Sequence, residues 1–295
     1  MKICIAGATG VIGRALVPKL LAAGHSPRLL VRDPAKASNL FEDVEIVECD
    51  LLAFGMEAKL APMMDGCEAL IHAATSIPHN FSAPGALTAN THLRIRGTGR
   101  LQRAALDVGV TTFIQQSIIM AYRDSGDDWL DENTWIDQSP ERREICHPVA
   151  IMESMMRLFA RQPKPMRWVV LKGGQFVGPG TFQADVVETI RKQELIIPGD
   201  GSHFVSFVHV EDYADAYVAA LERAPAASLF NICAEPIRYG DYVDHIADLI
   251  QSPHPPRDPS QLRPVSHRAS PKAAREILGW KPKHSIWPLV APASL

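Results

Sequence analysis

The chain has 295 residues, enough to bury a large core in one α/β domain or in a domain with a smaller lobe. Charged residues make up 21% and the formal net charge is -3, so no basic surplus points to nucleic acid or to an anionic membrane. Five scattered cysteines without a CxxC, no signal peptide and no bilayer-length apolar run predict a soluble cytoplasmic protein without a metal site.

The first stretch, residues 2–21, predicts a strand, a glycine turn and a helix. An apolar run at residues 3–5 is followed by GATGVIG at residues 7–13 and by apolar residues at helical spacing. Gly7 allows a tight turn, Gly10 lets backbone approach a pyrophosphate, and Gly13 lets the helix pack on the sheet. We expect this loop, with Thr9, Val11 and Ile12, to hold a dinucleotide. Because the spacing is GxxGxxG, an ordinary glycine-rich turn is the alternative.

The next two predicted strands, residues 28–31 and 44–51, indicate which cofactor binds. In a dinucleotide-binding fold, an acidic residue at the end of the second strand binds the ribose 2′-hydroxyl. Here the strand ends in Val31 and Arg32, whose guanidinium can pair with a 2′-phosphate. This favours NADP over NAD; the alternative is that Arg32 is solvated and Asp33 serves the ribose. Asp50 and Leu51 are placed to reach the adenine.

Further strands are predicted at residues 69–74, 112–117 and 168–171, separated by helical patterns. This alternation indicates an α/β protein with a doubly wound parallel sheet. The small residues that end the fourth strand, and the polar end of the fifth, would lie along the cofactor; they are Ala73, Ala74, Thr75 and Gln116. His72, within the apolar fourth strand, is expected to be a core histidine.

Residues 124–148 lack periodicity and form a long connection that holds Trp129 and Trp135. Long ordered loops often cover a site, so we expect a lid. Its acidic cluster resembles a metal site only superficially, and a solvated loop is the expected role. In the helix that follows, Met152 and Met156 form a second apolar face, either core or subunit contact. Later residues predict a strand at 204–208, a helix at 210–221 and an extended proline-rich segment at 251–264.

The whole chain resembles an extended short-chain dehydrogenase/reductase of the NAD-dependent epimerase/dehydratase family. The resemblance rests on residues 7–13, IHAAT at 71–75, Gly97-Thr98, GPG at 178–180, FVHVEDYADAYVAAL at 207–221 and LGWKPKHS at 278–285. It implies an NAD(P)-binding Rossmann domain over residues 1–172 and a substrate lobe over 173–295, with 204–222 returning to the first domain. It further implies a small-molecule substrate near Gln175 and Phe176, and a homodimer.

The catalytic residues of that family are missing from their usual places. Its members carry a Tyr-x-x-x-Lys pair on the helix after the long loop, where the lysine lowers the tyrosine pKa. Residues 145–153 hold neither, and no tyrosine of this chain has a lysine four residues later. Ile118, Arg94 and Val205 stand where the resemblance would place a serine or threonine, an asparagine and a diphosphate-binding arginine. Candidates for a replacement acid are Ser117, Tyr122 and His147, each of which also has an ordinary structural explanation.

Two functions remain open from sequence. One is an oxidoreductase of atypical mechanism; the other is a non-catalytic NAD(P)-binding redox sensor or regulatory protein. Ile118, Val205 and Phe176 would suit a small substrate that is not strongly anionic, if the three line one cleft. We therefore predict that the protein is not a standard sugar-nucleotide epimerase or dehydratase. The competing hypothesis is that Arg94, His147 and the lid restore those roles from new positions.

Overall fold

The computed structural model describes residues 1–78, 80–81, 83–159 and 166–289. A seven-stranded parallel sheet forms its centre, in the order β3-β2-β1-β4-β5-β6-β11. The predicted doubly wound sheet is confirmed. Its strands are β1 (Lys2–Ala6), β2 (Ser26–Val31), β3 (Glu45–Glu48), β4 (Ala69–His72), β5 (Thr112–Ile118), β6 (Arg167–Gly173) and β11 (Ser228–Ile232).

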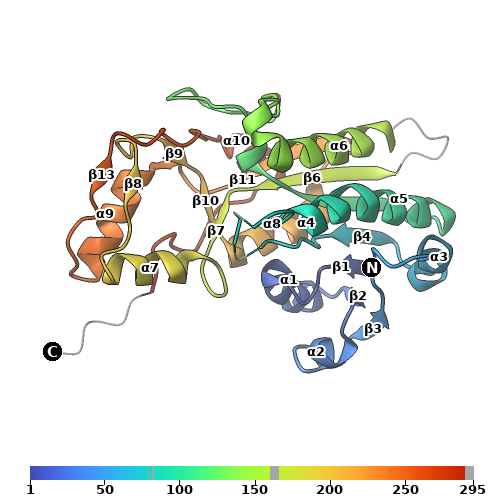
Figure 1. Cartoon of the computed structure of the whole chain (residues 1–295). Coiled ribbons are helices and arrows are strands. Elements are labelled where there is room, and N and C mark those ends of the chain that lie inside the picture. Colours follow the sequence, from blue (N-terminus) through green and yellow to red (C-terminus); the bar gives the residue numbers. More distant parts are fainter. Residues whose placement is uncertain (79, 82, 160–165, 290–295) are drawn as a thin grey trace.

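Helices cover both faces of the sheet, and each face has its own apolar core (Figure 1). One face packs against α1 (Val11–Ala22), α8 (Val210–Arg223) and α10 (Lys272–Leu278). The other packs against α3 (Glu57–Met64), α5 (Thr98–Asp107) and α6 (Arg143–Phe159). The short α2 (Pro34–Ser38) lies beside β3, and α4 (Thr88–His92) leads into α5 through a π-helical turn, Leu93–Gly97. The carboxyl ends of the parallel strands therefore lie along one edge of the sheet, between the two helical layers.

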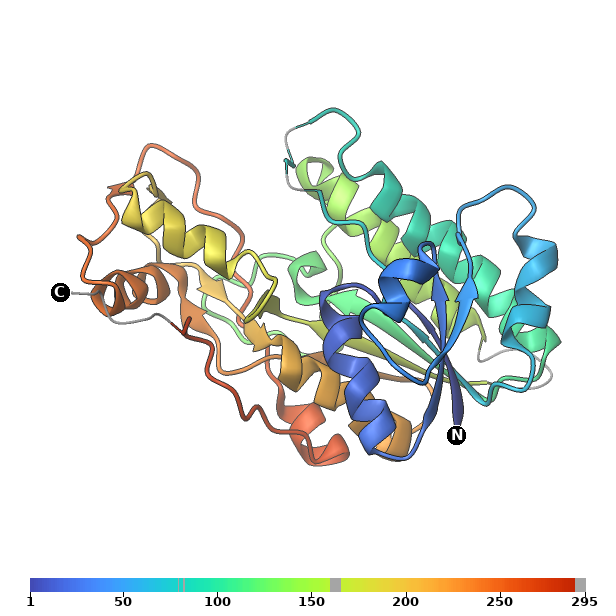
Figure 2. The same cartoon turned by 90° about the horizontal axis from the view of Figure 1, so that it is seen from below.

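A smaller C-terminal lobe extends beyond the sheet (Figure 2). It contains β7 (Gln175–Val177), α7 (Gln183–Arg191), β8 (Ile197–Pro198), β9 (Phe204–Val205), β10 (Phe207–His209), β12 (Ile237–Arg238), α9 (Tyr239–Leu249) and β13 (Arg257–Asp258). A third apolar cluster holds the lobe together, with the rings of Phe207 and Tyr242 stacked at 4.1 Å. Between these elements the chain returns to the central sheet as β11. Residues 1–172, the range given above for the Rossmann domain, therefore leave out one strand of that sheet.

Two local predictions need correction, and burial decides one alternative that the sequence left open. The strand expected at 204–208 is interrupted at Ser206, whose hydroxyl donates to the His267 carbonyl; β9 and β10 consequently pair with different partners. The long connection ends earlier than expected, since α6 begins at Arg143 and includes Pro148. A helix-interior proline loses one hydrogen bond, but the buried face of α6 outweighs that loss. Met152 and Met156 belong to this buried face, so they are core and not a subunit contact.

Candidate active site

The turn from β1 into α1 leaves no room for a side chain at two of its glycines. Gly7 has φ +99°, and a Cβ there would lie 2.5 Å from the Ala74 nitrogen. A Cβ on Gly13 would lie 2.3 Å from the Ala8 carbonyl oxygen. Gly10 is exposed at the start of α1, and no side chain of the described residues caps that helix. Its first N–H groups are thus free to bind an anion, and the loop fits the pyrophosphate of a dinucleotide.

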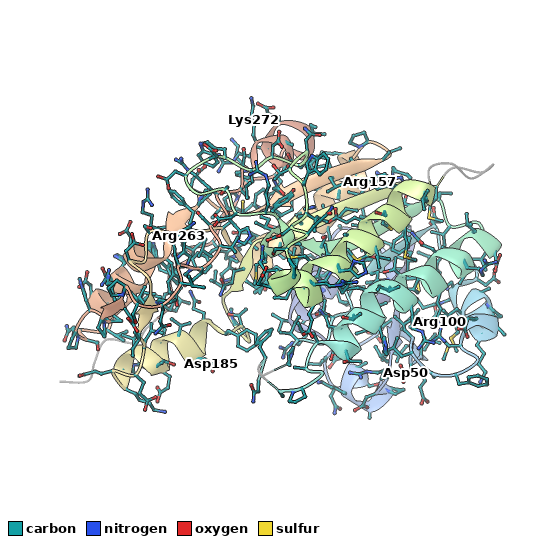
Figure 3. All side chains as sticks on the ribbon, turned by 45° about the horizontal axis from the view of Figure 1, so that its top comes forward. Asp50, Arg100, Arg157, Asp185, Arg263 and Lys272 are labelled. Carbon is teal, nitrogen blue, oxygen red and sulfur yellow. The ribbon has the colours of Figure 1, made fainter. Side chains whose placement is uncertain are left out.

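The predicted adenine end lies at the carboxyl ends of β2 and β3. Arg32 is exposed, and no ion pair or hydrogen bond of its side chain occurs among the described residues. Asp33 caps α2, accepting the Lys36 N–H at 3.0 Å. Asp50 is exposed, and its carboxylate accepts the Leu52 N–H at 2.9 Å. Figure 3 shows Asp50 and Arg100 on the side of the molecule away from Arg263 of the smaller lobe.

Other predicted cofactor residues lie along the same edge of the sheet. Ala73 and Ala74 follow β4 and contact Gly7, and Thr75 after them is exposed. Gln116 of β5 is 4% exposed, and its Oε1 has no hydrogen-bond partner in the described part of the chain. A buried amide oxygen without a partner is costly unless a ligand satisfies it. Gln116 is therefore suited to donor groups of a bound cofactor.

A buried ionic network fills the corner between β5, β6 and α6. Ser117 and Lys172 are direct neighbours in the parallel register of the two strands. The Lys172 ammonium lies 3.1 Å from Oε1 of Glu153, and the Ser117 hydroxyl donates to the same oxygen at 2.6 Å. All three side chains are at most 2% exposed. Burial lowers the pKa of Lys172, and attraction to the Glu153 carboxylate opposes that shift.

Tyr122 lies on the other side of Lys172, with its ring centroid 4.0 Å from the ammonium. Its hydroxyl donates to Oδ1 of Asn231 at 2.9 Å, and burial raises the pKa of Tyr122 well above its usual range. The Asn231 N–H in turn donates to Glu132 at 2.8 Å. His147, by contrast, is exposed on α6. Of the three candidate acids, Ser117 and Tyr122 thus meet at one lysine and His147 does not.

Sequence reasoning missed Lys172 and Glu153 as partners. A signal was present, because each is a charged residue within an otherwise apolar buried surface. Glu153 lies on the α6 face that also buries Cys146, Val149 and Met152, and Lys172 ends the run Trp168 to Leu171. Opposite charges on the buried faces of two consecutive elements predict a buried pair, because neither charge can be buried alone.

The substrate-side predictions are only partly brought together. Gln175 and Phe176 line a small cavity with aromatic residues of the lobe, Phe207, Tyr239 and Tyr242. Ile118 packs instead with Cys146 and Val149, whereas Val205 packs with the apolar cluster of the smaller lobe. The three apolar positions predicted to suit a less polar substrate consequently do not share one cluster.

The long loop is anchored to the smaller lobe. Asp124 pairs with Arg263 at 2.8 Å, and Asp127 pairs with Arg238 at 3.2 Å. Trp129 is half exposed, with the Arg268 guanidinium 4.3 Å from its ring centroid. No group of His, Cys, Asp or Glu in the described ranges could hold a metal ion. The carboxylates of Asp124 and Asp127 thus anchor the loop.

Comparison with known proteins agrees with this geometry. A model of the NAD dependent epimerase/dehydratase family matches residues 3–233. The chain belongs to this family. Among its curated relatives, a 3-diazoavenalumate denitrifying reductase from a Streptomyces species is 31% identical over 97% of this chain and 98% of that protein. Anthocyanidin reductase from Arabidopsis thaliana is 22% identical over 86% of this chain and 81% of that protein.

Solved structures show the same fold. UDP-glucose 4-epimerase from Thermotoga maritima, solved with UDP-glucose, has a TM-score of 0.80 and 21% identity, covering 97% of this chain and 94% of that one. A dTDP-glucose 4,6-dehydratase from Streptomyces venezuelae, solved with NAD, also has a TM-score of 0.80, at 17% identity, covering 97% of this chain and 93% of that one. At such identities the likeness establishes the fold and leaves the reaction to the site.

Proposed function

We propose that this family member is an NADP(H)-dependent reductase of a small substrate that is not strongly anionic, working without a tyrosine–lysine acid. The observation that carries the proposal is the buried network of Ser117, Glu153 and Lys172. It occupies the corner between α6 and the ends of β5 and β6, near which the family's proton-transfer pair would be expected. A reduced nicotinamide would supply hydride there.

The available proton donors determine which acceptors fit. Reduction of a carbonyl creates an oxyanion that an acid must protonate. Here the Ser117 hydroxyl is bound to Glu153 and the Tyr122 hydroxyl to Asn231, while burial raises the tyrosine pKa. An acceptor that forms no oxyanion needs neither group. An aryl diazonium ion is one: hydride bonds to the ring carbon, the C–N bond breaks, and its electron pair leaves with dinitrogen.

The Streptomyces relative supports this choice of acceptor. Its name describes a reductase that removes nitrogen from a diazo compound, and its 31% identity extends over nearly the full length of both chains. Val205, at the place of the family's diphosphate-binding arginine, disfavours a nucleotide sugar.

The preference for NADP rests on Arg32. It is exposed at the end of β2 and has no side-chain partner among the described residues, so its guanidinium can pair with a 2′-phosphate. Asp33, the alternative ribose ligand, already caps α2. A carboxylate committed to backbone N–H groups is less suited to the 2′-hydroxyl.

The test is NADPH oxidation with three substrate classes: aryl diazonium ions, aryl ketones or aldehydes, and nucleotide sugars. We expect steady turnover with the first, yielding the dediazotised arene. Inversion or water loss from a nucleotide sugar at an ordinary enzymatic rate would contradict the proposal. Cofactor binding without turnover of any class would support the regulatory alternative instead.

We also propose a homodimer in the cytoplasm. Leu158 is 56% exposed on α6, about one turn after the half-buried Met155, whose methyl group lies beside Gly99 of α5. No helix in the described part of the chain is long and apolar enough to cross a membrane. Light scattering at micromolar concentration tests the dimer, and Leu158→Glu should yield a monomer.

A further inference from the structure

Arg94 is a buried cation within the π-helical turn that joins α4 to α5. Its side chain is 4% exposed. Burial lowers the pKa of Arg94 to about 10, against the opposing attraction of Glu153, so the guanidinium stays charged at neutral pH. A buried charge is costly unless a partner compensates it, and π-helical turns are frequent at functional sites.

The described residues give Arg94 no anionic partner. Its Nη1 donates to the Met152 sulfur at 3.8 Å, and a thioether is a weak acceptor. Glu153, the buried carboxylate that attracts Arg94, uses Oε1 for Lys172 and Ser117. The carboxylate of Glu132 accepts from the Asn231 N–H. Two cations on this side of the sheet thus face one fully buried carboxylate.

The position of Arg94 places it over the carboxyl edge of the sheet. A Cβ on Gly97 would lie 3.4 Å from Nε2 of His72, the last residue of β4. The helix runs from this edge back toward the start of β5, so Arg94, about one turn earlier, lies beyond the strand end. Its contact Met152 directly precedes Glu153, which touches the ends of β5 and β6.

Two donor nitrogens of Arg94 are not fully enclosed. The fully enclosed nitrogens without a hydrogen-bond partner in the described chain include Nε1 of Trp168 and Nδ1 of His203, but none from Arg94. Its Nε and Nη2, which have no partner among the described residues, therefore keep some exposed surface. His72 beside them cannot supply charge, because burial lowers the pKa of His72 to about 4 and the ring is neutral.

We propose that Arg94 is the anion-binding residue of the substrate site and takes the carboxylate of a small aryl or arylalkenyl carboxylic acid. This rests on the proposed reductase function. A guanidinium binds a carboxylate through two parallel N–H bonds, and one monoanion matches one unpaired cation. A diphosphate would need further cations. The cofactor pyrophosphate has its own place at the start of α1, on another part of the edge.

The experiment measures binding, so it does not depend on turnover. The NADP-saturated protein is titrated by calorimetry with benzoate, cinnamate and 3-phenylpropanoate, each beside its primary amide. We expect at least one acid to bind about 10-fold or more tightly than its amide. Arg94→Gln should abolish this preference, and Arg94→Lys should keep part of it because the charge remains.

Arg96→Gln is the matched control, since Arg96 lies in the same turn but is exposed. It should keep the full preference, and all variants should retain wild-type NADP affinity as evidence of folding. Three results would overturn the proposal. They are equal binding of acids and amides, no binding of any acid at about 10 mM, which is roughly the weakest measurable affinity, and a preference for acids that is retained in Arg94→Gln. A roughly 10-fold loss of NADP affinity in Arg94→Gln would assign the residue to the cofactor phosphates instead. Should Arg94→Gln not fold, the Lys variant decides: an unchanged acid-to-amide ratio there contradicts a bidentate contact.

Discussion

Two regions at the carboxyl edge of the sheet are built by different means. The turn from β1 into α1 is shaped by backbone, and Gly7 and Gly13 are required because a Cβ there would meet neighbouring main-chain atoms. The corner of β5, β6 and α6 acts through side chains, with Lys172, Glu153 and Ser117 buried together. The first region is kept as the family has it, whereas the second differs from the family pattern. Binding and chemistry can therefore change separately within one fold.

Breaking the ionic corner should give the largest effect on stability. Lys172→Met leaves the Glu153 carboxylate buried without its partner, and we expect a loss of about 3–5 kcal/mol in the free energy of unfolding. Urea unfolding measures it. The NADP affinity of the folded variant should stay close to wild type, because the glycine loop is untouched.

The control is Lys192→Met, which breaks the exposed pair with Glu188 on and after α7; its expected cost is about 0.5 kcal/mol or less. The double variant Glu153→Met and Lys172→Met should recover much of the stability lost in Lys172→Met. A loss below about 1 kcal/mol in the single variant would show that the network is not as closed as its burial indicates.

Changing the glycine loop should give the opposite pattern. In Gly7→Ala the new Cβ would meet the Ala74 nitrogen and also adopt φ +99°. We expect NADP affinity to fall about 100-fold, roughly 2.7 kcal/mol, because the loop must move from its binding position. Gly109→Ala provides the control, since Gly109 has φ +77° but nothing within 4 Å of its Cβ. Gly109→Ala has the same backbone strain without the clash, so its NADP affinity should stay close to that of wild type. Equal losses of NADP affinity in the two variants would show that the close approach of Ala74 to Gly7 is not the cause.

His72 lies between the two regions and should make stability depend on pH. The pKa of His72 is about 4 in the folded state and about 6.5 in the unfolded state, so the unfolded chain binds the proton more tightly than the folded chain does. Stability is therefore full above about pH 6.5 and falls as the pH drops toward 4, by about 2 kcal/mol between pH 6.5 and 5. Comparing His72→Asn with wild type in urea should show a shallower slope. The exposed His147→Asn should leave the slope unchanged.

The smallest effect expected is on cofactor choice. Arg32→Ala should reduce the ratio of NADP to NAD affinity about 10-fold, since one exposed guanidinium–phosphate contact contributes on the order of 1–2 kcal/mol. Calorimetry on both cofactors gives the ratio. If wild type binds NADP and NAD equally, or if the affinity ratio is unchanged in Arg32→Ala, then Arg32 does not bind the 2′-phosphate.

Each region could be predicted from sequence to the extent that its residues lie close together along the chain. The sheet and the glycine loop depend on local patterns, in which strand, turn and helix lie within about 20 residues, and both were predicted. The corner draws on residues as far apart as Ser117 and Asn231, whose meeting depends on strand order and register. Periodicity alone also could not find the break at Ser206 or the continuation of α6 through Pro148, because tertiary hydrogen bonds and burial decide both.

The central claim is that reduction proceeds here without a tyrosine or serine acid. The most direct test is single-turnover hydride transfer from 4-deuterated NADPH to an aryl diazonium carboxylate in wild type, Tyr122→Phe and Ser117→Ala. The rate is measured from about pH 6 to about pH 8, a range over which the titration of an essential acid would change it. We predict deuterium on the ring carbon that carried nitrogen, a rate that varies less than about threefold with pH, and similar rates in all three proteins. A rate that falls about tenfold per pH unit, and drops about 100-fold or more in either variant, would contradict the account.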